Sequence, residues 1–209
     1  MLKLAVRISC LILVSFLSLA ACAQEFSADM VSTYKQGKTN TSQIYVAKDK
    51  MRVESFGEKK TGAAVIDFAH NTEMVVMTEQ HMYMEIPMHQ LAQSAMTFWR
   101  PDATDACPQW QKIAASIKDA KHQLVSCHKL GNDVVNGRAA VKYEGSSSDG
   151  NTATVWIDPK LRFVLKMHDK NGDFDLRNIK EGAQSASLFE PPAGYRKFDV
   201  GQKLAHPAH

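Results

Sequence analysis

The chain has no marked excess of either charge, which bears on its partners. Its 25 lysines and arginines face 22 aspartates and glutamates, and the formal net charge is +3 at pH 7. Two of the basic residues, Lys3 and Arg7, lie in the N-terminal leader, so the remainder carries 23 basic and 22 acidic residues. Nucleic-acid-binding domains usually show a strong basic excess. A nucleic acid is therefore not expected as a partner.

The sequence also lacks the short motifs of common catalytic sites. It contains no Gly-x-Ser-x-Gly, no His-Glu-x-x-His and no glycine-rich phosphate loop, so no hydrolase nucleophile, zinc-protease site or nucleotide site is predicted. Asp67, Asp158 and Asp173 fall at predicted strand ends or turns, where carboxylates accept hydrogen bonds from backbone amides. We expect no enzyme, no catalytic residue, no resident metal and no cofactor.

No apolar run reaches the roughly 20 residues of a membrane-spanning helix. The apolar stretch from Ile8 to Ala21 follows Lys3 and Arg7 and is shorter than that. A basic start followed by a short apolar run is typical of a secretory signal peptide, here residues 1–21, with residues 22–209 as a single domain.

The end of this leader permits two interpretations. Leu19-Ala20-Ala21-Cys22 resembles a bacterial lipobox, in which Cys22 becomes the lipidated first residue. Ala23 is then not the aspartate that retains lipoproteins at the inner membrane, so the expected location is the outer membrane, facing the periplasm. Alternatively, Ala21-Cys22-Ala23 fits ordinary cleavage, which gives a soluble periplasmic protein starting near Gln24.

Apart from Cys10 in the leader and Cys22 at its end, the chain has two cysteines, Cys107 and Cys127. In an oxidising compartment such a pair predicts a disulfide. Closing a loop of about 20 residues contributes roughly 3 kcal/mol in the chain-entropy model. A redox pair or metal site is the alternative, but no Cys-x-x-Cys spacing supports it.

The clearest structural pattern is a β-hairpin over residues 152–166. Two runs of β-branched and aromatic residues flank Asp158-Pro159-Lys160, which has turn chemistry. A three-residue loop, 158–160, would place Ile157 opposite Leu161 and Val155 opposite Phe163. One face is then apolar throughout, formed by Ala153, Val155, Ile157, Leu161, Phe163 and Leu165. The other is more polar, formed by Thr154, Trp156, Arg162, Val164 and Lys166.

Similar alternation along the chain predicts an antiparallel meander interrupted by helices. One helix is expected from Pro87 to Arg100 and a second from Asp105, a candidate N-cap, towards Leu124. This insert suggests helices laid across the open face of a curved sheet, an α+β fold. The predicted strands span residues 26–35, 42–47, 50–56, 63–68, 73–78, 82–86, 123–130, 139–143, 152–157, 161–166 and 174–179.

Four segments together resemble the bacterial superfamily of outer-membrane lipoprotein carriers and receptors (LolA/LolB-like), in particular a lipoprotein-sorting branch. They are the lipobox, Cys127–Gly131 with Val135–Arg138, Trp156–Arg162 and Phe189–Tyr195. The resemblance implies an incomplete β-barrel whose concave face and helical cover enclose a hydrophobic cavity. In that family the carriers hold the acyl chains of a lipoprotein in transit.

The leading hypothesis is therefore a binding module for acyl chains or an acylated protein, attached to the outer membrane through its N-terminal lipid. A sensor module for envelope stress, with an envelope protein as partner, is a second possibility. The side chains expected to line the cavity are Met82, Met84, Ile86, Leu91, Met96, Val155, Ile157, Leu161, Phe163 and Leu165.

A third hypothesis concerns the methionines and histidines between His70 and His89. Thioethers and imidazoles are suitable ligands for Cu(I), so a periplasmic copper-binding protein is an alternative. Methionine also suits the lining of a cavity for variable acyl chains, because its side chain is flexible and polarizable. His81, at a predicted turn, is the one candidate ligand without a packing explanation. The residues concerned are His70, Met74, Met77, His81, Met82, Met84, Met88 and His89.

Overall fold

One strongly curved sheet contains all the strands of the described residues. The computed structural model describes residues 25–56, 62–88, 105–116 and 124–199, and the statements below concern these residues. The strands are β1 (Phe26–Tyr34), β2 (Thr39–Val46), β3 (Lys50–Phe56), β4 (Gly62–Asp67), β5 (Thr72–Met77), β6 (Met82–Pro87), β7 (Leu124–Val135), β8 (Arg138–Ser147), β9 (Thr152–Asp158), β10 (Phe163–Asp169), β11 (Gly172–Glu181) and β12 (Arg196–Lys197). The helical elements are α2 (Cys107–Ser116) and the short 3₁₀ helix η3 (Ala186–Phe189).

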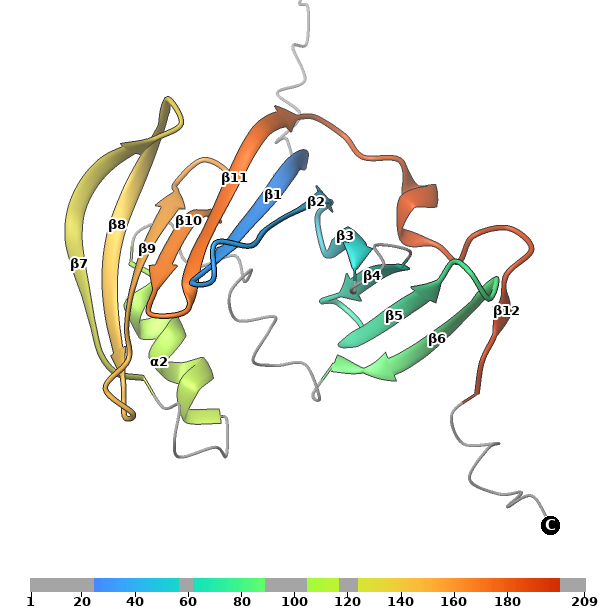
Figure 1. Ribbon diagram of the computed structural model, residues 1–209, viewed down its shortest axis with the longest axis horizontal. Coiled ribbons are helices and arrows are strands. Elements are labelled where there is room, and N and C mark those ends of the chain that lie inside the picture. Colours follow the sequence, from blue (N-terminus) through green and yellow to red (C-terminus); the bar gives the residue numbers. More distant parts are fainter. Residues whose placement is uncertain (1–24, 57–61, 89–104, 117–123, 200–209) are drawn as a thin grey trace, which may run out of the picture.

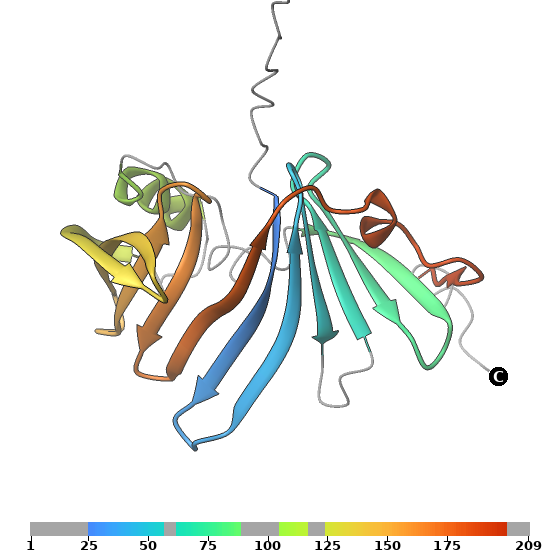
Figure 2. The ribbon, with the colours of Figure 1, turned by 90° about the horizontal axis from the view of Figure 1, so that it is seen from above.

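The strand order is β12-β6-β5-β4-β3-β2-β1-β11-β10-β9-β8-β7. All neighbours pair antiparallel except β12 and β6, which are parallel. The sheet bends into an arch that does not close, with α2 inside its β7–β10 half (Figures 1 and 2). This confirms the predicted α+β fold with an incomplete barrel, and confirms a helical cover for that half of the arch.

The helical insert is partly described. Asp105 Oδ1 accepts a hydrogen bond from the Cys107 amide at 3.0 Å, the capping contact expected where α2 begins. Leu124, predicted as the end of the helical stripe and as part of the 123–130 strand, is the first residue of β7. The helix predicted from Pro87 to Arg100 falls mostly outside the described residues. No helix in the described ranges is long and apolar enough to cross a membrane.

The predicted register of the β9–β10 hairpin is wrong. Phe163 pairs with Asp158 and Val164 with Ile157, so residues 159–162 form a four-residue loop. The Asp158 carboxylate accepts hydrogen bonds from the Lys160 and Leu161 amides, at 2.7 and 3.0 Å, and the Asp158 carbonyl accepts one from Arg162. Arg162 adopts a positive φ of 51°. The side-chain bonds of Asp158 therefore set a longer loop than the apolar pattern suggested.

A bulge in β10 also changes which side chains face the core. Pairing shifts between Val164 and Lys166, so Leu165 is the extra residue. Val164 was predicted on the polar face but is only 2% exposed, and Leu165 is 1% exposed. Lys166 remains on the opposite side, where its ammonium lies 5.2 Å from the centre of the Trp156 ring. With Phe163, which is 1% exposed, three consecutive residues are buried here, a pattern that strict alternation does not predict.

We define the inner face of the sheet as the face on which α2 lies. Paired residues share a face, and residues two apart along a strand do so too, so the register assigns the sides. The inner face is continuous from β8 to β6 and contributes most of the larger core cluster. It carries Phe26, Ala28, Met30, Ile44, Val46, Met51, Val53, Ala64, Ile66, Tyr143, Val155, Ile157, Met167, Phe174 and Leu176.

The opposite side, the outer face, has its own apolar cover over β3–β6. Phe189 of η3 is 7% exposed and packs with Val65, Met74 and Val76. Arg52 Nη1 donates a hydrogen bond to the Leu188 carbonyl at 2.9 Å, which fixes this segment. The chain then returns along β6 as β12. The C-terminal segment is thus a strap across the outer face that ends at the sheet edge.

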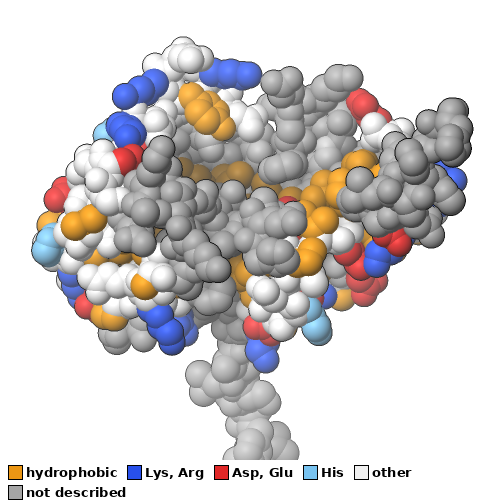
Figure 3. Space-filling view, turned by 90° about the horizontal axis from the view of Figure 1, so that it is seen from below, with side chains coloured by type: hydrophobic (Ala, Val, Ile, Leu, Met, Phe, Trp, Pro, Cys, Tyr) orange, Lys and Arg blue, Asp and Glu red, His pale blue; other side chains and the backbone are white. Residues whose placement is uncertain are grey.

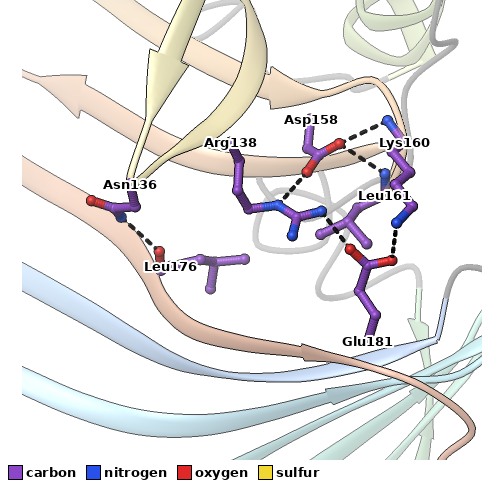
Figure 4. Close-up of polar contacts among 7 residues, drawn as sticks. All are labelled: Asn136, Arg138, Asp158, Lys160, Leu161, Leu176 and Glu181. Atoms are coloured by element: carbon purple, nitrogen blue, oxygen red, sulfur yellow. Dashed lines mark hydrogen bonds and ion pairs between the residues drawn. The ribbon is translucent and has the colours of Figure 1, made fainter.

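An ion-pair network centred on the buried carboxylate of Asp158 ties the β9–β10 loop to the rest of the sheet (Figure 4). Arg138 Nε lies 2.6 Å from the carboxylate of Asp158, which is 3% exposed, and Arg138 Nη2 lies 2.8 Å from Glu181. Lys160 Nζ lies 2.6 Å from the other oxygen of Glu181. Hydrogen bonds from Lys160, the largest influence, and from Arg138 hold the pKa of Glu181 below its usual range.

Candidate functional site

An apolar cavity lies between α2 and the inner face of β8–β10. Its volume is about 220 Å³. Trp110 and Ala114 of α2 form one wall, and the side chains of the strands form the other. Figure 3, seen from the side on which α2 lies, shows hydrophobic side chains gathered in a hollow across the molecule, with charged side chains towards its rim. The strand residues lining the cavity are Leu124, Gly145, Ala153, Val155, Val164 and Met167.

Two contacts fix α2 over this cavity. The disulfide between Cys107 and Cys127, with Cα atoms 5.5 Å apart, joins the first residue of the helix to β7 and confirms the predicted pairing. Trp110 packs edge-on against Tyr143 of β8, with ring centroids 5.6 Å apart. Because both contacts lie in the first turn of the helix, they hold that end of α2 at a set distance from the sheet.

The rim of the cavity is polar. Ser146, Ser147 and Asn151, in and beside the β8–β9 turn, line one end. Asn151 Oδ1 is buried without a hydrogen-bond partner among the described residues, although the Asn151 backbone is held by Ser147 and Asp149. An unpaired amide oxygen at the edge of an apolar cavity can accept a hydrogen bond from a ligand hydroxyl or amide.

The predicted cavity residues of the β9–β10 hairpin occupy different positions in the structure. Val155 lines the cavity, and Ile157 is buried beside it, paired with Val164. Phe163 packs edge-on against Phe26 of β1, at 5.2 Å between ring centroids. The bulge residue Leu165 and the loop residue Leu161 are buried in the same core.

The predicted lining residues of β6 lie at the other end of the inner face. The register places Met82, Met84 and Ile86 on that face, each partly buried. Leu91 and Met96 lie outside the described residues. The predicted residues therefore occupy two separate parts of the inner face.

Sequence reasoning missed Trp110 and Ala114 as cavity walls, together with Val164 and Met167. Trp110 and Ala114 are four residues apart in the helix predicted from Asp105, so helical periodicity places them on one face and a signal was available. Val164 could not be found from alternation, because the bulge reverses its side.

The methionines and histidines of the 70–89 segment are divided between sites. Met77, Met82 and Met84 share the inner face, whereas Met74 is buried on the outer face with Val76. His70 bonds Asp67 at 2.9 Å. These contacts give His70 a structural partner and separate Met74 from the three methionines of the inner face. Met88 packs against the larger core cluster, and His89 lies outside the described residues.

His81 now has a packing explanation. Its ring lies 5.3 Å from that of Tyr195, and its carbonyl accepts a hydrogen bond from the Arg196 amide. The residue adopts a positive φ of 50° at the β5–β6 turn. It therefore belongs to the contact that brings the C-terminal strap to the edge of β6. No cluster of three or more His, Cys, Asp or Glu side chains suited to a metal occurs within the described ranges.

The comparisons with known proteins identify a fold. No protein-family model and no curated protein matches the sequence. Among solved structures, an uncharacterized conserved protein from Thermus thermophilus aligns with a TM-score of 0.53 at 13% identity, over 83% of this chain and 89% of that one. The likeness to the Thermus protein shows a common fold.

Two further solved structures extend the comparison. The MucA/MucB complex from Pseudomonas aeruginosa aligns with a TM-score of 0.48 at 18% identity, over 82% of this chain and 58% of that one. A LolA superfamily protein from Nitrosomonas europaea aligns with a TM-score of 0.32 at 10% identity, over 79% and 90%.

Proposed function

We propose that this protein is a lipid-anchored binding module of the periplasm that holds the acyl chain of a lipid or acylated protein against the inner face of its sheet. The observation that carries the proposal is the apolar cavity between α2 and β8–β10. Its volume of about 220 Å³ is below the roughly 300–1,000 Å³ of pockets for drug-sized ligands. A slender group, such as a segment of an acyl chain, suits this space better than a bulky ring system.

The chemistry of the lining supports the same ligand class. Val155, Val164 and Met167 offer aliphatic and thioether contacts, which stabilise a chain mainly through removal of its surface from water. Met82 and Met84 add thioethers to the same face of the sheet, at its β6 end and apart from this cavity. Unbranched methionine side chains can adjust to chains of different length.

The proposal includes an anchor and a partner. Cys22, at the end of the lipobox, carries the lipid and directs the domain to the outer membrane, where the ligand would be an acylated protein or a membrane lipid. An envelope protein that delivers or receives this ligand completes the proposal. Mass spectrometry of the protein purified from membranes tests both parts, because it reports lipid on Cys22, retained ligand and any bound protein. A mature chain that starts near Gln24 would contradict the anchor.

The binding proposal is tested with a fluorescent fatty acid and delipidated protein. Wild-type protein should bind the probe, and Ala153→Phe should bind it roughly tenfold more weakly, a loss of about 1.4 kcal/mol, because the new ring occupies the cavity. Thr154→Phe is the matched control, since residue 154 is the next position of β9 and faces the other side. Absence of probe uptake by folded wild-type protein would refute the proposal. Equal binding by both variants would exclude this cavity as the site.

A further inference from the structure

A single carboxylate interrupts the apolar inner face at its β4–β6 end. The register forms a row of facing residues from β1 to β6, in the order Phe26, Val46, Met51, Ile66, Glu73 and Ile86. Glu73 of β5 therefore stands between Ile66 and Ile86. The next row, Ala28, Ile44, Val53, Ala64, Val75 and Met84, is wholly apolar. Glu73 is the one ionisable residue of the two rows.

This carboxylate is buried and incompletely bonded. Glu73 is 4% exposed, and its Oε2 has no hydrogen-bond partner in the described part of the chain. Leaving a buried polar atom without a partner costs about 1–3 kcal/mol. A leucine would fit the row without that cost, so Glu73 has no evident stabilising role in the described structure.

Within the described ranges, the charged groups on the strands beside Glu73 are paired with other residues. On β4, Asp67 bonds Lys50 and His70 at the rim of the sheet. On β6, Glu85 faces the other side and pairs with Lys197. Burial alone raises the pKa of Glu73 above its ordinary value of 4.5. The neutral carboxyl is thus favoured relative to an exposed glutamate, and a neutral carboxyl is a hydrogen-bond donor.

We propose that Glu73 is the polar contact for the bound ligand, donating a hydrogen bond to the carbonyl oxygen of an acyl ester or amide whose chain lies along the apolar rows of the inner face. This inference rests on the proposed function and adds the chemical group recognised at the β4–β6 end of the inner face, apart from the β8–β10 cavity. A carbonyl accepts but does not donate, so it complements a protonated carboxyl. Lipids provide such carbonyls as esters, and acylated proteins provide them as esters and amides.

The test compares three probes that share one chain length: a long-chain methyl ester, the corresponding N-alkyl amide, and the alkane. Wild-type protein should bind the ester and the amide more tightly than the alkane, by roughly fivefold for one net hydrogen bond. Glu73→Leu should abolish this preference and leave alkane binding intact. Glu73→Gln should retain it, because the amide group still donates. Glu85→Leu is the matched control on the opposite face and should leave the preference unchanged.

The outcomes separate this inference from the proposed function. Wild-type protein that binds ester and alkane equally, or Glu73→Leu protein that keeps the preference, would overturn the role of Glu73 while the binding function stands. Folded wild-type protein that binds none of the three probes would overturn both. A preference for the amide over the ester favours an N-acylated protein as the source of the carbonyl, and the reverse preference favours a lipid or an O-acylated protein. Either preference supports the role of Glu73 if Glu73→Leu removes it.

Discussion

Cys107 and Cys127 join the first residue of α2 to β7, the edge strand of the sheet, across a sequence separation of 20 residues. This bond is the covalent link between the wall of the cavity formed by the helix and the wall formed by the strands. The helix itself spans only Cys107–Ser116, and isolated helices shorter than about 12–15 residues are marginal in water. The position of α2 therefore depends on this link and on the packing of Trp110.

Reducing the disulfide should lower the free energy of unfolding by about 3 kcal/mol, because the loop it closes then gains freedom in the unfolded chain. The same treatment should weaken acyl-probe binding, since α2 is one wall of the cavity. Urea unfolding with and without reductant measures the first effect, and probe titration in native buffer the second. The Cys107→Ser, Cys127→Ser double variant should reproduce both without reductant. Unchanged probe affinity after full reduction would show that the helix keeps its place unaided.

Replacing Arg138 with Met should destabilise the fold by about 3 kcal/mol, because the buried carboxylate of Asp158 then loses its charged partner. Lys170→Met provides the comparison, since Lys170 and Asp149 form a more exposed pair, 3.2 Å apart, and such pairs contribute about 0–1 kcal/mol. Equilibrium denaturation of the two variants measures the difference. Equal losses would argue against a structural role for the network in Figure 4.

Gly172→Ala should be strongly destabilising, because a β-carbon at this position would lie 2.0 Å from the carbonyl oxygen of Thr33 on β1. Gly150→Ala is the control. It also has a positive φ, of 77°, but has open space around it, so it should cost only about 1 kcal/mol. Thermal unfolding followed by circular dichroism would distinguish the two. Similar melting temperatures would mean that β1 and β11 can separate locally without loss.

Glu73→Gln should stabilise the protein increasingly as the pH rises. Burial raises the pKa of Glu73 in the folded state above its ordinary 4.5, so over the interval between the two values the folded protein retains a proton that the unfolded chain has lost. Wild-type stability therefore falls, relative to the variant, from about pH 4.5 upward until the folded-state pKa is passed. Below pH 4.5 the difference should be constant. Urea titrations at several pH values test this, and a difference that is flat throughout would contradict the burial of this group.

The sequence predicted the positions of turns and the buried faces of strands better than it predicted the pairing register between neighbouring strands. Asn136 and Gly137, a dipeptide typical of tight turns, form the turn between β7 and β8 with positive φ values of 50° and 78°. The β9–β10 loop was predicted one residue too short, because the side-chain bonds of Asp158 outweighed the pairing of apolar residues. Alternation identifies a strand, but it cannot locate a bulge such as the one at Leu165.

The candidate site was predicted in part for a related reason. Val155 could be assigned to the cavity because it alternates with polar residues along its own strand. Glu73 could not, because its position in an apolar row emerges only when β4, β5 and β6 are placed side by side. Whether a polar residue in a strand lies within an apolar row of the sheet depends on its cross-strand neighbours, which are at other positions in the sequence.

The pairing of β1 with β11 has a consequence for how the molecule assembles. Phe26 stands beside Glu181, so the first described strand and the eleventh are neighbours in the middle of the sheet. As the chain is synthesised, strands β1 to β6 can pair as a local meander, but β1 keeps one open edge until residues near the C-terminal end emerge. A nascent chain truncated before Gly172 would therefore leave one edge of β1 unpaired at what becomes the centre of the sheet. We expect a chaperone to bind at this exposed edge.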